Sequence, residues 1–69
     1  MQLFIKTIFG KLYVITISKH CTLNDLKYEI YKKSNIEIGD QILIYSGNEL
    51  KGNKELIEYE INDHIRLMI

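Results

Sequence analysis

The chain has 69 residues, and nine Lys and Arg balance nine Asp and Glu to give a formal net charge of zero. A neutral chain lacks the basic surface that binds a nucleic-acid backbone or an anionic membrane, so we expect neither as a partner. A chain of this length is expected to form one domain, residues 1–69, which buries only about 60% of the surface that the unfolded chain exposes.

The sequence also indicates a compartment. The lone cysteine, Cys21, cannot form an internal disulfide, and no apolar run approaches the ~18 residues of a membrane span. The N-terminal residues alternate like a strand and lack the long apolar core of a signal peptide. We therefore expect an intracellular, reducing environment, with a cytoplasmic or nuclear location.

The N-terminal segments predict a β-hairpin. Residues 2–7 alternate polar and apolar side chains, and residues 12–17 form a second run that is rich in β-branched residues. Residues 8–11 lie between them and contain Gly10, which indicates a turn.

An amphipathic helix is predicted next. Thr22 is a good N-cap residue, and Asp25 follows three positions later, as in a capping box. The helix should end near Asn35, because asparagine tolerates the left-handed conformation that closes many helices. Helical spacing separates an apolar face from a charged face. The apolar face holds Leu23, Leu26 and Ile30, and the charged face holds Lys27, Glu29, Lys32 and Lys33.

The remaining elements are short. We predict strands over residues 41–45, 48–50 and 65–69, a turn at Ser46-Gly47, and a helical turn over residues 56–59. A helix with one apolar stripe must be covered by a sheet, and the handedness of crossovers constrains how the helix connects its strands. The order therefore predicts an α+β fold of the β-grasp type: a mixed five-stranded sheet with one α-helix packed across one face.

Residues in every predicted element keep the spacing of a known family. The matching positions run along the chain without a gap: Met1, Gln2, Phe4, Lys6, Thr7, Gly10, Lys11, Thr22, Lys27, Ile30, Gln41, Leu43, Ile44, Gly47, Leu50, Leu56, Tyr59, Ile61 and Leu67. The chain therefore resembles the ubiquitin family over its whole length. The resemblance implies the β-grasp fold, recognition by the ubiquitin machinery, and a Tyr59 hydroxyl that fixes the loop before it.

The departures from the family pattern concern conjugation. Ubiquitin continues past the last strand into a tail that ends in paired glycines, whereas the given sequence ends at Ile69, so we expect no joining to a substrate through such a tail. The candidate chain-acceptor lysines at matching positions are Lys6, Lys11, Lys27 and Lys33, and Glu29, Asn48 and Asp63 replace the other family lysines. Glu37 and Ile38 replace the prolines that usually follow the helix, which predicts a less rigid connection.

Strand alternation assigns side chains to the two faces of the sheet. The side chains expected to face the helix are Leu3, Ile5, Tyr13, Ile15, Ile17, Leu43, Leu50, Leu67 and Ile69. Those expected to face outward are Phe4, Lys6, Leu12, Val14, Ile42, Ile44, Arg66 and Met68. Most of the outward set is apolar, so we expect a broad apolar patch.

The resemblance gives this patch a role. In ubiquitin the recognition surface centres on an isoleucine equivalent to Ile44, with neighbours at Ile8 and Met68. The full set of expected partner-binding residues is Ile8, Ile44, Met68, Phe4, Leu12, Val14, Ile42 and Gly47. Burying ~400 Å² of apolar surface would contribute about 10 kcal/mol, before association costs of ~4–15 kcal/mol. We expect a partner of micromolar affinity or weak self-association, the alternative being that another segment of the parent protein covers the face.

The sequence gives little support for a catalytic site, a metal site or a phosphate-binding loop. Cys21 precedes the helix N-terminus and adjoins His20, but sequence neighbours rarely form a catalytic pair, and we favour a structural cysteine. His20, Cys21 and His64 lack the paired spacing of a zinc site. The four glycines are dispersed turn residues and form no phosphate-binding loop. We therefore expect no enzyme, no metal and no cofactor.

The sequence favours one function and leaves three alternatives. The favoured function is a ubiquitin-like domain that binds proteins of the ubiquitin-proteasome system non-covalently: proteasomal receptors, ubiquitin-binding helices or ubiquitin-handling enzymes. The first alternative is a conjugatable modifier whose diglycine tail is missing from this chain. The second is a non-conjugatable ubiquitin mimic from a virus or another pathogen. The third is a homo-oligomeric structural domain.

Overall fold

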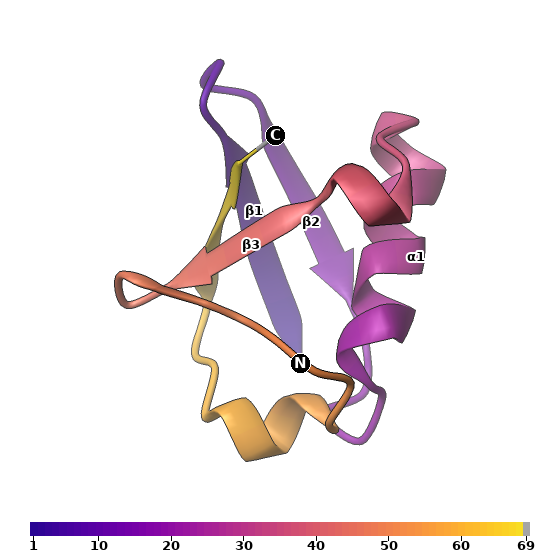
Figure 1. The fold of residues 1–69 in the computed structure, drawn as a ribbon, viewed down its shortest axis with the longest axis vertical. Coiled ribbons are helices and arrows are strands. Elements are labelled where there is room, and N and C mark those ends of the chain that lie inside the picture. The colour runs from indigo at the N-terminus through magenta and orange to yellow at the C-terminus, as the bar shows by residue number, and fades with distance from the viewer. Residues whose placement is uncertain (69) are drawn as a thin grey trace.

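The strands and the helix occur in the predicted order. The computed structural model describes residues 1–68, and Ile69, expected to face the helix, lies outside the described residues (Figure 1). The elements are β1 (Gln2–Thr7), β2 (Leu12–Thr16), α1 (Leu23–Ser34), η1 (Ile38–Asp40), β3 (Ile42–Tyr45), β4 (Asn48–Glu49), η2 (Leu56–Tyr59) and β5 (His64–Met68), where η marks a short 3₁₀ helix. The predicted α+β fold with a mixed five-stranded sheet and one α-helix is confirmed.

The β1–β2 hairpin closes through a turn that needs glycine. Gly10 has a φ of +84°, a left-handed conformation that costs a residue without a side chain little. The backbone N–H of Gly10 donates to the Thr7 carbonyl at 3.0 Å, and that of Thr7 donates to the Lys11 carbonyl at 2.8 Å. These bonds fix the register in which Phe4 pairs with Val14.

Helix α1 is capped at both ends as the sequence predicts. The backbone N–H of Asp25 donates to the Thr22 hydroxyl at 3.2 Å, and the backbone N–H of Thr22 donates to the Asp25 carboxylate at 2.9 Å, which completes a capping box. Asn35 closes the helix with a φ of +63°. The three predicted apolar residues are buried, whereas Lys27 and Glu29, expected on the charged face, are half-buried.

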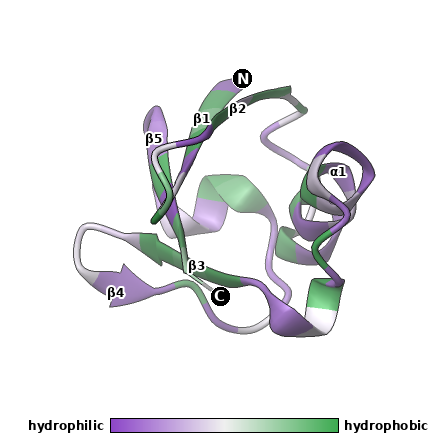
Figure 2. Cartoon of the chain, turned by 90° about the horizontal axis from the view of Figure 1, so that it is seen from above, coloured by the Kyte–Doolittle hydropathy of each residue, from purple (hydrophilic) through white to green (hydrophobic). Residues whose placement is uncertain are grey.

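The sheet has the strand order β2-β1-β5-β3-β4. The central strands β1 and β5 run parallel, and the other pairs run antiparallel. Figure 2 shows helix α1 standing apart from the sheet, with hydrophobic and hydrophilic colour alternating along β5 and a hydrophilic β4. The helix-facing apolar side chains fill the space between these two layers and form the core.

Burial confirms the predicted alternation along the strands. The expected inward residues Leu3, Ile5, Ile15, Ile17, Leu43, Leu50 and Leu67 are buried. Tyr13 is half-buried against the core, and the Lys11 ammonium lies 5.4 Å from the centre of its ring. None of the residues expected to face outward is buried.

The segment after the helix differs most from the prediction. It forms the 3₁₀ turn η1, which was not predicted from the sequence, and β3 begins at Ile42, one residue later than expected. The backbone of Gln41 is extended, but its N–H donates to the Ile38 carbonyl at 3.2 Å and so closes η1. The buried side chain of Gln41 donates from its amide to the carbonyls of Lys27 at 2.9 Å and Ile36 at 3.0 Å, which ties this segment to the helix.

The predicted role of Tyr59 is confirmed. Its hydroxyl donates to the Lys51 carbonyl at 2.7 Å and accepts from the Lys54 backbone N–H at 3.2 Å. Gly52 lies in the loop held by these bonds, has a φ of +85°, and leaves 3.6 Å between an added Cβ and the Tyr59 hydroxyl oxygen.

Candidate protein-binding face

The face of the sheet opposite the helix carries side chains in transverse rows. One row runs from Leu12 on β2 through Lys6 on β1 and Arg66 on β5 to Ile44 on β3, because these residues are register partners across adjacent strands. A second row joins Val14, Phe4 and His64. A third row pairs Met68 with Ile42. The register therefore brings four strands together on one surface.

The broad apolar patch expected from the sequence is divided by two basic residues. Lys6 and Arg66, here called the cation pair, are exposed and stand side by side on the two central strands. They separate a hairpin cluster, formed by Phe4, Leu12 and Val14, from a β3 cluster, formed by Ile42, Ile44 and Met68. The physical reason is the parallel pairing of β1 with β5, which places two basic positions next to each other.

The expected partner-binding residues differ in exposure. Ile8, Leu12, Val14 and Ile42 are exposed, at 51%, 52%, 38% and 39%, and Phe4, Ile44 and Met68 are half-buried. Ile8 and Met68 line one shallow depression together with both members of the cation pair. Gly47 and Ile44 line a second depression, and both members of the cation pair line this one too. Four of the eight expected residues therefore line two depressions that share the cation pair, and Phe4, Leu12, Val14 and Ile42 line neither.

Two aromatic rings stack at one end of this face. The rings of Phe4 and His64 stack with centroids 5.2 Å apart and an interplanar angle of 24°. The stacked imidazole covers part of the Phe4 ring, which is half-buried although it lies on an open sheet surface. His64 places an imidazole ring at the rim of the hairpin cluster.

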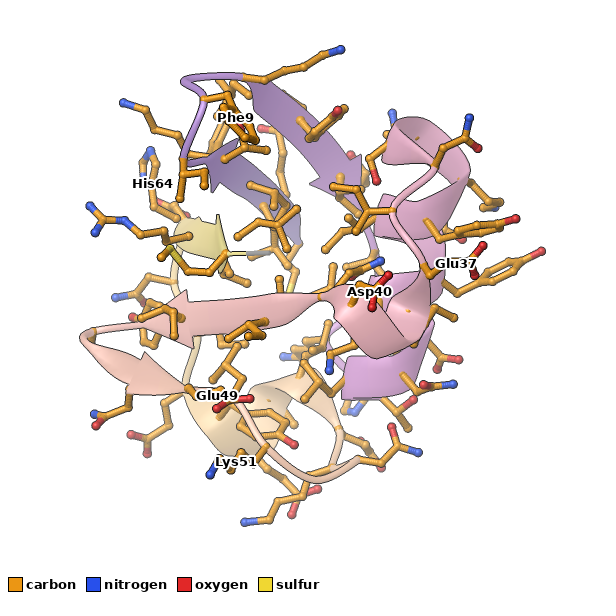
Figure 3. All side chains as sticks on the ribbon, turned by 45° about the horizontal axis from the view of Figure 1, so that its top comes forward. Phe9, Glu37, Asp40, Glu49, Lys51 and His64 are labelled. Atoms are coloured by element: carbon orange, nitrogen blue, oxygen red, sulfur yellow. The ribbon has the colours of Figure 1, made fainter. Side chains whose placement is uncertain are left out.

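Phe9 was not among the partner-binding residues predicted from the sequence. Its side chain is 80% exposed in the hairpin turn next to Ile8, and Figure 3 shows it at the end of the hairpin. Two consecutive apolar residues in a turn are a sequence signal that could have indicated this position, because hairpin turns usually carry polar residues. Phe9 extends the apolar surface beyond the edge of the sheet.

The candidate chain-acceptor lysines occupy different settings. Lys6, Lys11 and Lys33 are exposed, whereas Lys27 is half-buried on the helix. Lys6 lies within the candidate binding face, so a modification there would alter the face as well.

Cys21 and His20 contact different parts of the chain. Cys21 is half-buried against the core, and its carbonyl accepts a hydrogen bond from the Leu56 N–H at 2.8 Å. The imidazole of His20 contacts the Glu55 carboxylate at 3.1 Å. Among residues 1–68, no three His, Cys, Asp or Glu side chains group as metal ligands, and no helix is long and apolar enough to cross a membrane.

Comparison with known proteins agrees with this geometry. The model of the ubiquitin family matches residues 3–69. The chain belongs to the ubiquitin family. Members of this family are non-enzymatic modifiers and interaction domains. The chain is also similar to ubiquitin-like protein 4A of Rhinolophus ferrumequinum, with 28% identity over 67 residues, which are 97% of this chain and 42% of that protein. The chain therefore spans less than half the length of this relative.

Proposed function

We propose that residues 1–69 act as one ubiquitin-like interaction domain, without enzymatic activity, that binds partner proteins non-covalently through the sheet face opposite the helix. The partners would be proteins of the ubiquitin-proteasome system in the cytoplasm or the nucleus. The observation that carries the proposal is the pairing of Met68 with Ile42 next to Ile44, which gathers three apolar side chains on the face that the helix does not cover.

The energetics favour a partner of moderate affinity. The half-buried Ile44 and Met68 already pack against neighbouring side chains, so a partner would bury the remaining apolar surface at little cost in side-chain entropy. Apolar side chains gathered on one open face are typical of interaction surfaces, whereas scattered ones are ordinary. The family membership supports a protein partner.

A two-dimensional amide NMR titration tests the proposal. The labelled chain is titrated with a ubiquitin-binding helical peptide, and we expect shifts centred on Ile8, Ile44 and Met68. Ile44→Ala should weaken binding about ten-fold, because it truncates a central anchor. Ile57→Ala is the matched control, since Ile57 is 44% exposed but belongs to η2. Shifts that avoid the sheet face, or equal losses in the two variants, would contradict the proposal.

Self-association is the second candidate function, and the exposed apolar residues Leu12 and Val14 favour it. Both belong to β2, which pairs on one side only, with β1. A dilution series of the same NMR spectra, without peptide, should move the signals of Phe4, Leu12 and Val14 if copies of the chain associate through this surface. Spectra that do not change with concentration would exclude it.

A further inference from the structure

Most neighbours of the cation pair on this face are apolar, the exception being His64, which lies two residues before Arg66 on β5. Leu12 is the register partner of Lys6, and Ile44 is the register partner of Arg66, so an apolar residue flanks the pair at each end of its row. Phe4 and Met68 flank it along the strands, two residues from Lys6 and Arg66 respectively. The cations thus stand in the middle of the face rather than at a solvated rim.

Neither cation has an acidic partner within the described part of the chain. The ion pairs among residues 1–68 are His20 with Glu55 and Lys32 with Glu29, and neither involves Lys6 or Arg66. Like charges on directly paired strand positions repel each other. Glu49 ends the same row, but Ile44 stands between it and Arg66. A carboxylate placed over the pair would therefore relieve the repulsion and gain two cationic hydrogen-bond donors.

We propose that the face recognises an amphipathic helix of a partner protein whose apolar docking stripe is interrupted by one central Asp or Glu. The central carboxylate would lie over Lys6 and Arg66, and the flanking apolar side chains would contact Leu12 at one end and Ile44 at the other. This inference rests on the proposed function and specifies the chemistry of its partner.

The dimensions of the row suit such a helix. Three inter-strand spacings separate Leu12 from Ile44, which amounts to about 14 Å. Residues seven or eight positions apart on a helix lie on one face and about 11–12 Å apart along the axis, and a residue midway between them points the same way. The Phe4 and Met68 rows lie about 7 Å to either side of the helix axis, so a helix with a radius of about 5–6 Å would touch only the near side of their side chains. Docking would remove water from around the carboxylate and the cations, which strengthens their attraction.

The test begins with a displayed library of helical peptides that have Leu at the two flanking positions and a randomised central position. The library is selected on the wild-type chain, on Arg66→Glu, and on Lys33→Glu, which makes the same change in charge on helix α1. We expect enrichment of Asp and Glu at the centre with the wild type and with Lys33→Glu, and loss of this enrichment with Arg66→Glu. Thermal unfolding of both variants checks that each is folded.

The affinities of one selected peptide and its Gln counterpart then measure how much the carboxylate contributes to binding. The Glu peptide should bind the wild type at least about five-fold more tightly than its Gln counterpart at low salt, and the ratio should shrink near 0.5 M salt, where charges are screened. Peptides that shift the signals of Ile44 and Met68 without any preference for Glu would overturn this inference and leave the proposed function intact. Failure of every selected peptide to shift the sheet face would overturn both. A Glu preference that persists on Arg66→Glu would overturn the assignment to the cation pair.

Discussion

The Tyr59 hydroxyl donates a 2.7 Å hydrogen bond to the Lys51 carbonyl and so closes the loop between β4 and η2 on itself. The same oxygen accepts from the Lys54 backbone N–H, so one side chain satisfies two backbone groups of a segment that has no strand or helix of its own. This loop leads to the contact between η2 and the start of helix α1, where the Leu56 N–H donates to the Cys21 carbonyl.

Tyr59→Phe should lower the free energy of unfolding by about 0.5–1.5 kcal/mol, because it removes the bond to Lys51 and the acceptor for Lys54. Urea denaturation followed by circular dichroism measures the change. Tyr28→Phe is the matched control, since Tyr28 is 51% exposed on the helix. Equal losses in the two variants would show that the loop bonds contribute nothing.

Thr22→Ala should cost about 0.5–2 kcal/mol of stability, because it removes the side-chain half of the capping box at the start of α1. Thr22→Ser keeps the hydroxyl acceptor and should recover most of that loss. Chemical denaturation of the three proteins checks the prediction, and a Ser variant as unstable as the Ala variant would argue that the methyl group matters more than the cap.

Gln41→Met should destabilise the chain by about 1–3 kcal/mol, since it removes the donors to the Lys27 and Ile36 carbonyls in a buried setting.

Gln41→Glu tests the burial of the same position through the pH dependence of stability. Burial beside two carbonyls should raise the pKa of the introduced carboxyl above its unfolded value of about 4.3, because the charged form loses solvation and faces acceptors.

The sign of that pH effect follows from linkage. The folded variant would hold its proton to higher pH than the unfolded chain, so its stability should be greatest below pH ~4 and fall as the pH rises through the folded pKa. Unfolding midpoints of Gln41→Glu, each divided by the wild-type midpoint at the same pH, measure the effect. A ratio that stays constant from pH 4 to about pH 7 would contradict the buried position of this side chain.

Arg66→Gln should raise the free energy of unfolding by about 0.2–1 kcal/mol, because it removes the like charge at the strand position paired with Lys6. The gain should diminish as salt is added. Lys54→Gln removes the same charge from an exposed loop and serves as the control. Lower stability in Arg66→Gln at low salt would mean that the apolar part of the arginine side chain contributes more to packing than its charge costs.

Phe9→Ser should leave stability within about 0.5 kcal/mol of the wild type, because the side chain is 80% exposed. The same variant should weaken binding of a partner that reaches the hairpin turn, and should raise solubility. Parallel denaturation and peptide titration distinguish the two effects. A large loss of stability would show that the ring packs on the domain in solution.

Local features of the fold could be predicted from the sequence because their causes lie within a few residues. Thr22 with Asp25 begins the helix, Asn35 ends it, and Gly10 allows the hairpin turn. The alternation of β1 and β2 likewise assigned Ile5 to the core and Val14 to the open face, since the two sides of a strand follow from a period of two. The buried Gln41 was not predicted, because its partners on α1 and after it meet the side chain only once the chain is folded.

In the candidate site, too, some features could be predicted from the sequence and others depend on the fold. Alternation in the sequence predicts that the outward positions include Ile44 and Met68, and that Lys6 and Arg66 share their side of the sheet. That the two cations stand next to each other between two apolar clusters follows from the fold alone, because β1 and β5 are far apart in the sequence and meet through parallel pairing. Alternation determines the face on which a side chain lies, whereas the side chain beside it depends on which strands pair and in which register.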